Sequence, residues 1–216
     1  MKIRPAIALL LAGTALLAGC KREGELVIEQ GVGITALRSV CPAVGVPDFL
    51  GDVTLFSQPG VETVDAIDVT ASITNVRSTC NDQGENVYTE ASFDVVAQRR
   101  DPRGARSVEL PYFSTVMRGG DSVIAKRVGT VQVNFADGEI RATGSGKAGS
   151  FVNRSAATLP ADIRRRITEK RRPGESTAAI DPLTEPDVVA AIKAATFELL
   201  VGFQLTDDQL RFNAQK

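Results

Sequence analysis

The sequence predicts an α+β protein, with a mainly antiparallel β-sandwich first and helices at the C-terminal end. Apolar and polar residues alternate with a period of two in several stretches between residues 34 and 148. Short turn sequences separate these stretches at even spacing, and the pattern becomes helical after residue 158. Strands that precede helices favour α+β over alternating α/β. A small barrel is the alternative arrangement of the strands.

Alternation defines the individual strands, and it is clearest over residues 87–97, where every second residue is apolar and those between are polar. A period of two over this length predicts a strand with one face in the core and one in water. A second alternating stretch, 65–75, is separated from it by the turn-like sequence 81–86, so the two predict a hairpin. Further strands are expected at 52–56, 107–117, 122–135 and 139–148.

Pro111 interrupts the stretch 107–117, and proline has no N–H to donate to a ladder. We therefore expect this strand at the edge of a sheet or at a bulge. An exposed edge carries unpaired backbone groups to which a partner can add a strand. The stretch 107–117 is accordingly the predicted docking site.

Six or seven antiparallel strands at short, even spacing resemble the two-sheet sandwich of immunoglobulin-like domains. The resemblance is one of architecture, because the chain contains no tryptophan and so lacks the buried Trp of true immunoglobulin domains.

The C-terminal part predicts helices. Residues 162–172 carry Ile163 and Ile167 on one face and end before a Pro-Gly pair. A capping box at Thr206–Gln209 predicts a last short helix. Between them, a longer helix from Thr184 is expected to pack an apolar stripe on the sandwich; the stripe consists of Val188, Val189, Ile192, Thr196, Leu199, Leu200 and Phe203.

The first twenty residues have the architecture of a secretory signal peptide. Lys2 and Arg4 supply positive charge, and an uncharged core of 13 residues follows, shorter than the about 20 residues of a membrane span. Leu17-Ala18-Gly19-Cys20 then resembles the lipobox of bacterial lipoproteins. The resemblance implies that residues 1–19 are removed and that Cys20 is acylated. A cleaved leader that leaves a free cysteine is the alternative.

Lipidation implies a location for the mature chain. Each buried methylene contributes about 0.8 kcal/mol, so the three acyl chains usual in this family anchor a protein permanently. Lipoproteins with Asp after the acylated cysteine tend to stay in the inner membrane, but Lys21 follows Cys20 here. The resemblance therefore implies the periplasmic face of the outer membrane. Residues 20–33 are the expected tether, 34–150 the sandwich domain, and 158–216 a helical region packed on it.

Two cysteines, Cys41 and Cys80, remain after lipidation of Cys20. In an oxidising compartment they predict one disulfide, which closes a loop of roughly 40 residues and stabilises the fold by about 4 kcal/mol on the chain-entropy model. Two reduced, buried thiols are the alternative.

Composition excludes several classes of function. Without residues 1–19 the formal charge is −3, too close to neutral to suggest a nucleic-acid partner. The chain contains no histidine, which removes the commonest general base, the usual zinc ligand and every His-based triad. The glycine-rich stretch 141–150 fails the P-loop spacing, and no serine-lysine motif occurs in the mature chain. We expect no catalytic residues, no metal and no cofactor.

A basic segment is the one charged cluster. Its six cations are candidates for contact with an anionic surface such as lipid headgroups, although a solvated helix face is the simpler interpretation; they are Arg164, Arg165, Arg166, Lys170, Arg171 and Arg172. The C-terminal Lys216 faintly resembles the lysine that links one class of outer-membrane lipoproteins to peptidoglycan.

These features together resemble the uncharacterised lipoproteins of Gram-negative envelopes. The expected function is that of a non-catalytic, membrane-anchored module that binds an envelope protein or a glycan. A carrier of an apolar ligand, held between sheet and C-terminal helix, is the alternative.

Overall fold

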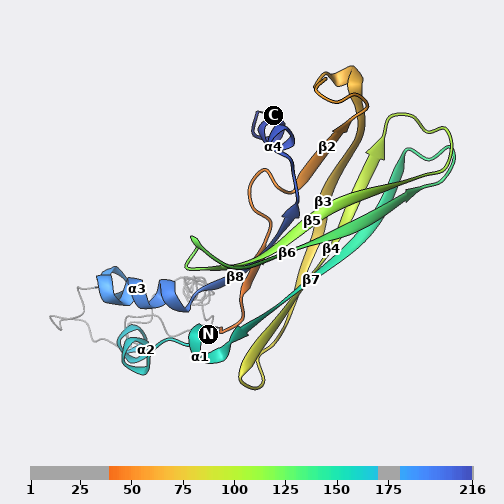
Figure 1. The fold of residues 1–216 in the computed structure, drawn as a ribbon. Coiled ribbons are helices and arrows are strands. Elements are labelled where there is room, and N and C mark those ends of the chain that lie inside the picture. Colours follow the sequence, from red (N-terminus) through yellow and green to blue (C-terminus); the bar gives the residue numbers. More distant parts are fainter. Residues whose placement is uncertain (1–38, 170–180, 216) are drawn as a thin grey trace, which may run out of the picture.

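The computed structural model describes residues 39–169 and 181–215 (Figure 1). Its strands form two four-stranded sheets: the first has the order β1-β8-β5-β6 and the second the order β2-β3-β4-β7. The strands are β1 (Ala43–Gly45), β2 (Asp52–Phe56), β3 (Ile67–Asn81), β4 (Asn86–Arg99), β5 (Arg106–Arg118), β6 (Ser122–Phe135), β7 (Arg141–Asn153) and β8 (Phe197–Phe203). The helices are α1 (Arg154–Ala157), α2 (Ala161–Thr168), α3 (Pro186–Ala195) and α4 (Asp207–Ala214), with 3-10 turns η2 (Val64–Ala66) and η4 (Pro182–Thr184).

Antiparallel pairing dominates both sheets, as the alternating patterns predict. The β3–β4 hairpin turns at residues 82–85, and β5 and β6 form a second hairpin that turns at Gly119 and Gly120, both with positive φ. Among the described strands, only β1, of three residues, runs parallel to its neighbour, β8. The expected strands and turns between residues 52 and 148 are thereby confirmed, apart from the position of β5 within its sheet.

The inner faces of the two sheets share one apolar core. It takes alternate residues of β4 and β6 together with residues of β3, β7 and β8. Its fully buried members include Val69, Val95, Val133, Val201 and Phe203. At an apolar transfer energy of about 25 cal/mol per Å², such a shared core explains why the two layers stay together.

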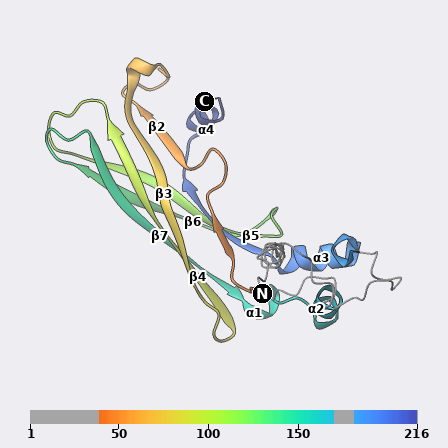
Figure 2. The ribbon, with the colours of Figure 1, turned by 180° about the vertical axis from the view of Figure 1, so that it is seen from behind.

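Arg99 clamps one end of the two layers. It is the last residue of β4, it is 2% exposed, and it contacts the loops on either side. The Nε donates to the carbonyl of Glu139 (2.7 Å) and Nη1 to that of Gly104 (2.8 Å). The Nη2 donates to the carbonyls of Pro102 (2.6 Å) and Ala136 (2.8 Å). These four bonds join the β4–β5 and β6–β7 loops, which lie together at one end of the molecule in both Figures 1 and 2.

From the Arg99 end, the layers diverge toward the opposite end (Figures 1 and 2). β6 and β7 stay close over the first part of this path. At Gly144 of β7 there is no room for a side chain, because an added Cβ would lie only 2.7 Å from the carbonyl oxygen of Gln132 on β6. Farther along, Tyr112 bridges the layers by donating its hydroxyl to the carbonyl of Lys147 (2.6 Å). Beyond this bridge the edge strands separate.

The segment 197–203 departs from the sequence prediction. The expected helix from Thr184 to Phe203 is wrong: helix α3 covers only Pro186–Ala195, and residues 197–203 form β8 between β1 and β5. Its residues are almost all buried, and a short apolar run of this kind fits a central strand as well as a buried helix. The chain leaves the helix at Thr196, which is already extended (φ −91°, ψ 127°).

β5 is not an edge strand, so of the two arrangements expected from Pro111 only the bulge is found, and it lies at Val116/Met117 and not at the proline. The strand lies between β6 and β8. Pro111 is tolerated because it lies one residue beyond the end of the β5–β8 ladder, which begins at Tyr112 paired with Phe203. Its missing N–H therefore leaves no partner in β8 unpaired. The docking site predicted at 107–117 does not exist as an open edge.

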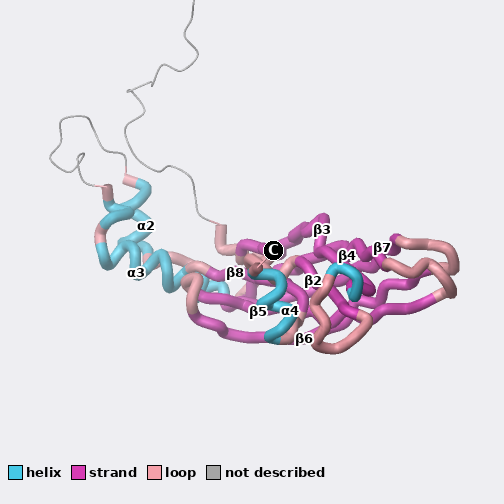
Figure 3. The backbone as a smooth tube through the Cα atoms, turned by 90° about the horizontal axis from the view of Figure 1, so that it is seen from above, coloured by secondary structure: helices cyan, strands magenta, loops and turns pink. Residues whose placement is uncertain are grey.

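Helices α2 and α3 lie at one end of the molecule, beyond the strands (Figure 3). Their buried residues form a second, small apolar cluster made of Leu159, Ile163, Val188 and Ala195. The buried residues of α3, Val188 and Ala195, thus pack in this separate cluster. The sequence pattern predicted instead that the apolar stripe of the longer helix packs on the face of the sandwich. α4 begins with the predicted capping box of Thr206 and Gln209, and Asn213 Nδ2 fixes it to the carbonyls of Phe49 and Asp52.

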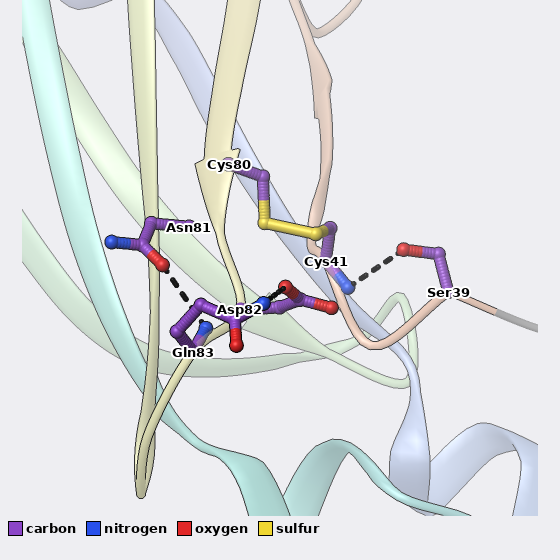
Figure 4. Close-up of a disulfide and its surroundings, with 6 residues drawn as sticks. All are labelled: Ser39, Cys41, Cys80, Asn81, Asp82 and Gln83. Carbon is purple, nitrogen blue, oxygen red and sulfur yellow. Dashed lines mark hydrogen bonds between the residues drawn. A yellow bond between two sulfur atoms is a disulfide. The ribbon is translucent and has the colours of Figure 1, made fainter.

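The predicted disulfide is confirmed. Cys41, just before β1, is joined to Cys80 at the end of β3, with 6.2 Å between their Cα atoms (Figure 4). The bridge ties the short edge strand of the first sheet to the second sheet. Lipidation at Cys20 and the role of Lys216 lie outside the described residues.

Candidate binding site between the two sheets

β6 forms a long edge of the first sheet. It spans Ser122–Phe135 and pairs only with β5. Near Gln132, β7 covers this edge. Over residues 122–130 no other strand of the described chain pairs with it, so backbone donors and acceptors line the open side.

The register identifies which backbone groups face the open side. In an antiparallel ladder the N–H and C=O of one residue point the same way and alternate along the strand. Pro111 points toward β8, since its carbonyl accepts a bond from the N–H of Gln204, and it pairs with Thr130 on β6. Thr130, Val128 and Lys126 therefore direct their N–H and C=O groups away from β5, toward the open side.

Apolar side chains are exposed along the same segment, which we call the β6 edge segment (residues 122–130). Val128 is 62% exposed, Val123 61% and Ile124 55%. Soluble proteins usually blunt such an edge with charge, proline or a covering loop. The β6 edge segment carries charge at Lys126 and Arg127 but no proline, and its exposed apolar side chains indicate an interaction surface.

A cleft opens beside the β6 edge segment, where the two layers have separated. It consists of two neighbouring hollows of about 420 and 260 Å³ that share Val116, Ala125 and Phe151 in their walls. We call it the inter-sheet cleft. Val116 and Leu199 of the first sheet are its apolar floor, and Ser150 and Val152 of β7 form the opposite side. Its size is in the range of ligand pockets, about 300–1,000 Å³.

One buried hydroxyl at this cleft and one beside it lack a hydrogen-bond partner among the described residues. Ser150, 4% exposed, lines the cleft, and Thr89, fully buried, is its register partner on β4. Neither oxygen has a partner among the described residues. Buried polar groups are satisfied in the large majority of cases, and an unsatisfied one costs about 1–3 kcal/mol. The Ser150 hydroxyl is therefore available to a polar group that enters the cleft.

Positive charge borders the cleft. Arg127 lines it and makes no ion pair with the described part of the chain. Arg118 lines the far end, where it donates to the carbonyl of Ala194 (2.6 Å) and lies over the Phe197 ring. Lys126 lies over the ring of Phe113. The β6 edge segment is thus cationic as well as apolar.

An aromatic pair stands on the outer side of the cleft. Phe151 is 72% exposed, and its ring centroid lies 4.7 Å from that of Tyr88. Glu90 accepts bonds from Lys147 (3.2 Å) and from the Tyr88 hydroxyl (3.1 Å), which lower the pKa of its carboxyl. The bond to Glu90 in turn raises the pKa of Tyr88. Glu90 is therefore ionised at neutral pH and holds the Tyr88 ring in place.

The basic segment is only partly free to meet an anionic surface. Arg164 and Arg165 are exposed on α2, whereas Arg166 forms ion pairs with Glu185 and with Asp187. These bonds raise the pKa of Arg166 and lower that of Asp187, so the guanidinium joins α2 to the start of α3. Lys170, Arg171 and Arg172 lie outside the described residues.

We expect α2 to loosen in acid before the sheets do. The bond from Arg166 holds the pKa of Asp187 below its ordinary value of 3.8, so its contribution to stability is complete above 3.8 and is lost as the pH falls through the lowered pKa. Amide hydrogen exchange in Ala161–Thr168 should therefore accelerate as the pH is lowered to about 3, after correction for the intrinsic rate. Arg166→Gln should show the faster exchange already at neutral pH. An α2 protected equally in both proteins at both pH values would contradict this role.

Sequence reasoning found none of the cleft residues. The alternation places Ser150 and Thr89 on inner faces, but only the divergence of the layers opens a cleft at that position. Within the described ranges, no helix is long and apolar enough to cross a membrane. No family model matches the chain, and neither the curated proteins nor the solved structures contain a match.

Proposed function

We propose that the chain is a lipid-anchored, non-catalytic envelope protein that captures an extended segment of a partner protein along the β6 edge segment. Strand addition is thus proposed at β6, which has a free side, and not at 107–117, where the sequence pattern predicted it. The observation that carries it is the open edge of β6, with its alternate backbone groups unpaired.

The edge favours a protein over a glycan as the partner. Thr130, Val128 and Lys126 present donors and acceptors at the spacing of a β-ladder, and an extended peptide backbone matches that spacing over its whole length. The exposed Val123, Ile124 and Val128 add apolar surface that a second strand would cover. The main-chain bonds would supply affinity and the neighbouring cleft would supply selectivity.

A displayed library of extended nine-residue peptides tests strand addition, with the full chain reconstituted in lipid nanodiscs as the target. We expect enriched peptides to bind the parent and Val128→Thr, which keeps the N–H. They should lose at least tenfold in affinity for Val128→Pro, because proline removes one donor from the open side and leaves the β5 ladder intact. Equal unfolding midpoints of the two variants would show that the fold is retained. Failure to enrich any peptide, or equal binding by Val128→Pro, would refute strand addition.

The anchor is part of the same proposal and rests on the lipobox-like sequence Leu17-Ala18-Gly19-Cys20. Cys20→Ser should leave the membrane fraction of the cell, and the N-terminal fragment of the parent should carry fatty acids. A Cys20→Ser protein that sediments with membranes as the parent does would refute the anchor without touching the binding site. Attachment to the periplasmic face of the outer membrane is proposed on Lys21.

The cleft supports a second candidate function, the binding of an apolar ligand. The sequence analysis expected such a ligand between a sheet and the C-terminal helix, whereas the hollow lies between the two sheets. Native mass spectrometry of the purified protein should then reveal a co-purifying small molecule. For the fold, we propose the immunoglobulin-like class of sandwich, supported by two antiparallel layers with a common core.

A further inference from the structure

We propose that the captured segment carries an acidic residue and a large apolar residue two positions apart, both turned into the inter-sheet cleft. This inference rests on the proposed strand addition and names the chemistry of the partner. It depends on which β6 side chains share a face with the incoming strand.

One face of the added strand would turn toward the cleft. Side chains alternate between the faces of a sheet, so residues of the new strand opposite Ala125 and Arg127 would lie on the same face as these two. Both line the cleft, together with Ser114 and Val116 of the neighbouring strand β5. Tyr112, which bridges to Lys147, closes the cleft at one end and limits the open stretch to a few residues.

Arg127 selects an acidic residue at the first of these positions. Its guanidinium has no ion-pair partner among the described residues, whereas Arg99 of β4 donates to backbone carbonyls and Arg106 of β5 pairs with Asp68. A carboxylate directly across the strand would give Arg127 a partner. We expect a preference of about 1.4-fold to fivefold for Glu over Gln in the peptide, the range of one cross-strand charge pair.

Ala125 leaves room for a large apolar residue at the second position. Its side chain is a single methyl group, and Val116 and Leu199 lie behind it, 8% and 1% exposed. The two hollows meet at this point, since both are lined by Ala125 and Val116. A Leu or Phe of the partner would bury its side chain there, whereas Ala would leave the hollow unfilled.

Repeated peptide selection on three targets tests the inference: the parent, Arg127→Glu and Ala125→Leu. We expect peptides selected by the parent to combine an acidic and a large apolar residue two positions apart. Arg127→Glu should select a basic residue at the first position. Ala125→Leu fills the hollow from within, so it should bind the parent's peptides at least tenfold more weakly while its unfolding midpoint does not fall.

The outcomes separate the two proposals. Peptides that depend on the Val128 N–H but show no acidic or apolar preference would overturn the inference and leave strand addition standing. Absence of any binding peptide would overturn both. A long-chain carboxylate such as palmitate that binds the parent, is excluded by Ala125→Leu and displaces the peptides would assign the cleft to an amphiphile and overturn the inference.

Discussion

Arg99→Met is expected to lower the free energy of unfolding by about 4 kcal/mol. Only the removal of the disulfide is expected to have an effect of similar size. The substitution keeps much of the side-chain volume but removes all four bonds. The carbonyls of Glu139 and Gly104 lose their donor, whereas those of Pro102 and Ala136 keep the N–H groups of Gly138 and Glu139. A hydrogen bond from a charged group contributes about 1.5–3 kcal/mol, and partial relaxation of the loops keeps the sum below full additivity.

Urea unfolding of both proteins, followed by circular dichroism, measures this effect. Arg103→Met is the matched control, because Arg103 lies in the same loop with its side chain 88% exposed and pairs only with Asp101. We expect the control to stay within about 0.5 kcal/mol of the parent. If Arg99→Met and Arg103→Met unfold at the same urea concentration, Arg99 does not clamp the two layers.

Removal of the disulfide by the double change Cys41→Ser and Cys80→Ser should have a similar effect. The two half-cystines are 39 residues apart, which corresponds to about 4 kcal/mol of loop-closure entropy in the unfolded chain. The bridge also holds the short parallel strand β1, whose three residues pair only with β8 in the described chain. We therefore expect faster hydrogen exchange in β1 in addition to the lower free energy of unfolding.

Reduction of the parent protein provides the control for the serine substitutions. The parent under reducing conditions should match the double variant in its urea midpoint, and reduction should leave the variant unchanged. A double variant as stable as the oxidised parent would show that the core and the β1–β8 pairing hold this edge without the bridge.

The period of two predicted most of the strands because both sheets have one wet face and one core face over long stretches. The inner face of β4 follows the pattern from Val87 through Val95 to Arg99. β8 was missed because it is buried on nearly all sides and so has no alternation. Its apolar residues directly follow a helix, and the sequence contains no turn signal between the two.

Arg99 was hidden by its neighbours in the charged sequence RRDPRGAR, which is typical of a solvated loop. The alternation along β4 indicated that Arg99 faces the core, because position 99 falls on the same face as Val95 and Ala97. The open edge of β6 could not be predicted in this way. Whether a strand lies at an edge is decided by long-range pairing. Pro111 suggested that β5 was the edge strand, but proline is tolerated equally well at the end of a ladder, which is where it lies.

Hydrogen exchange of single amides along β6, followed by NMR, tests the central claim most directly. In the free protein, the amides of Lys126, Val128 and Thr130 should exchange quickly, and those of Arg127 and Gly129, which face β5, should exchange slowly. A selected peptide should slow the first three and leave the other two unchanged. Protection of all five amides without peptide, or no change at Lys126, Val128 and Thr130 when peptide is bound, would contradict an open edge that captures a strand.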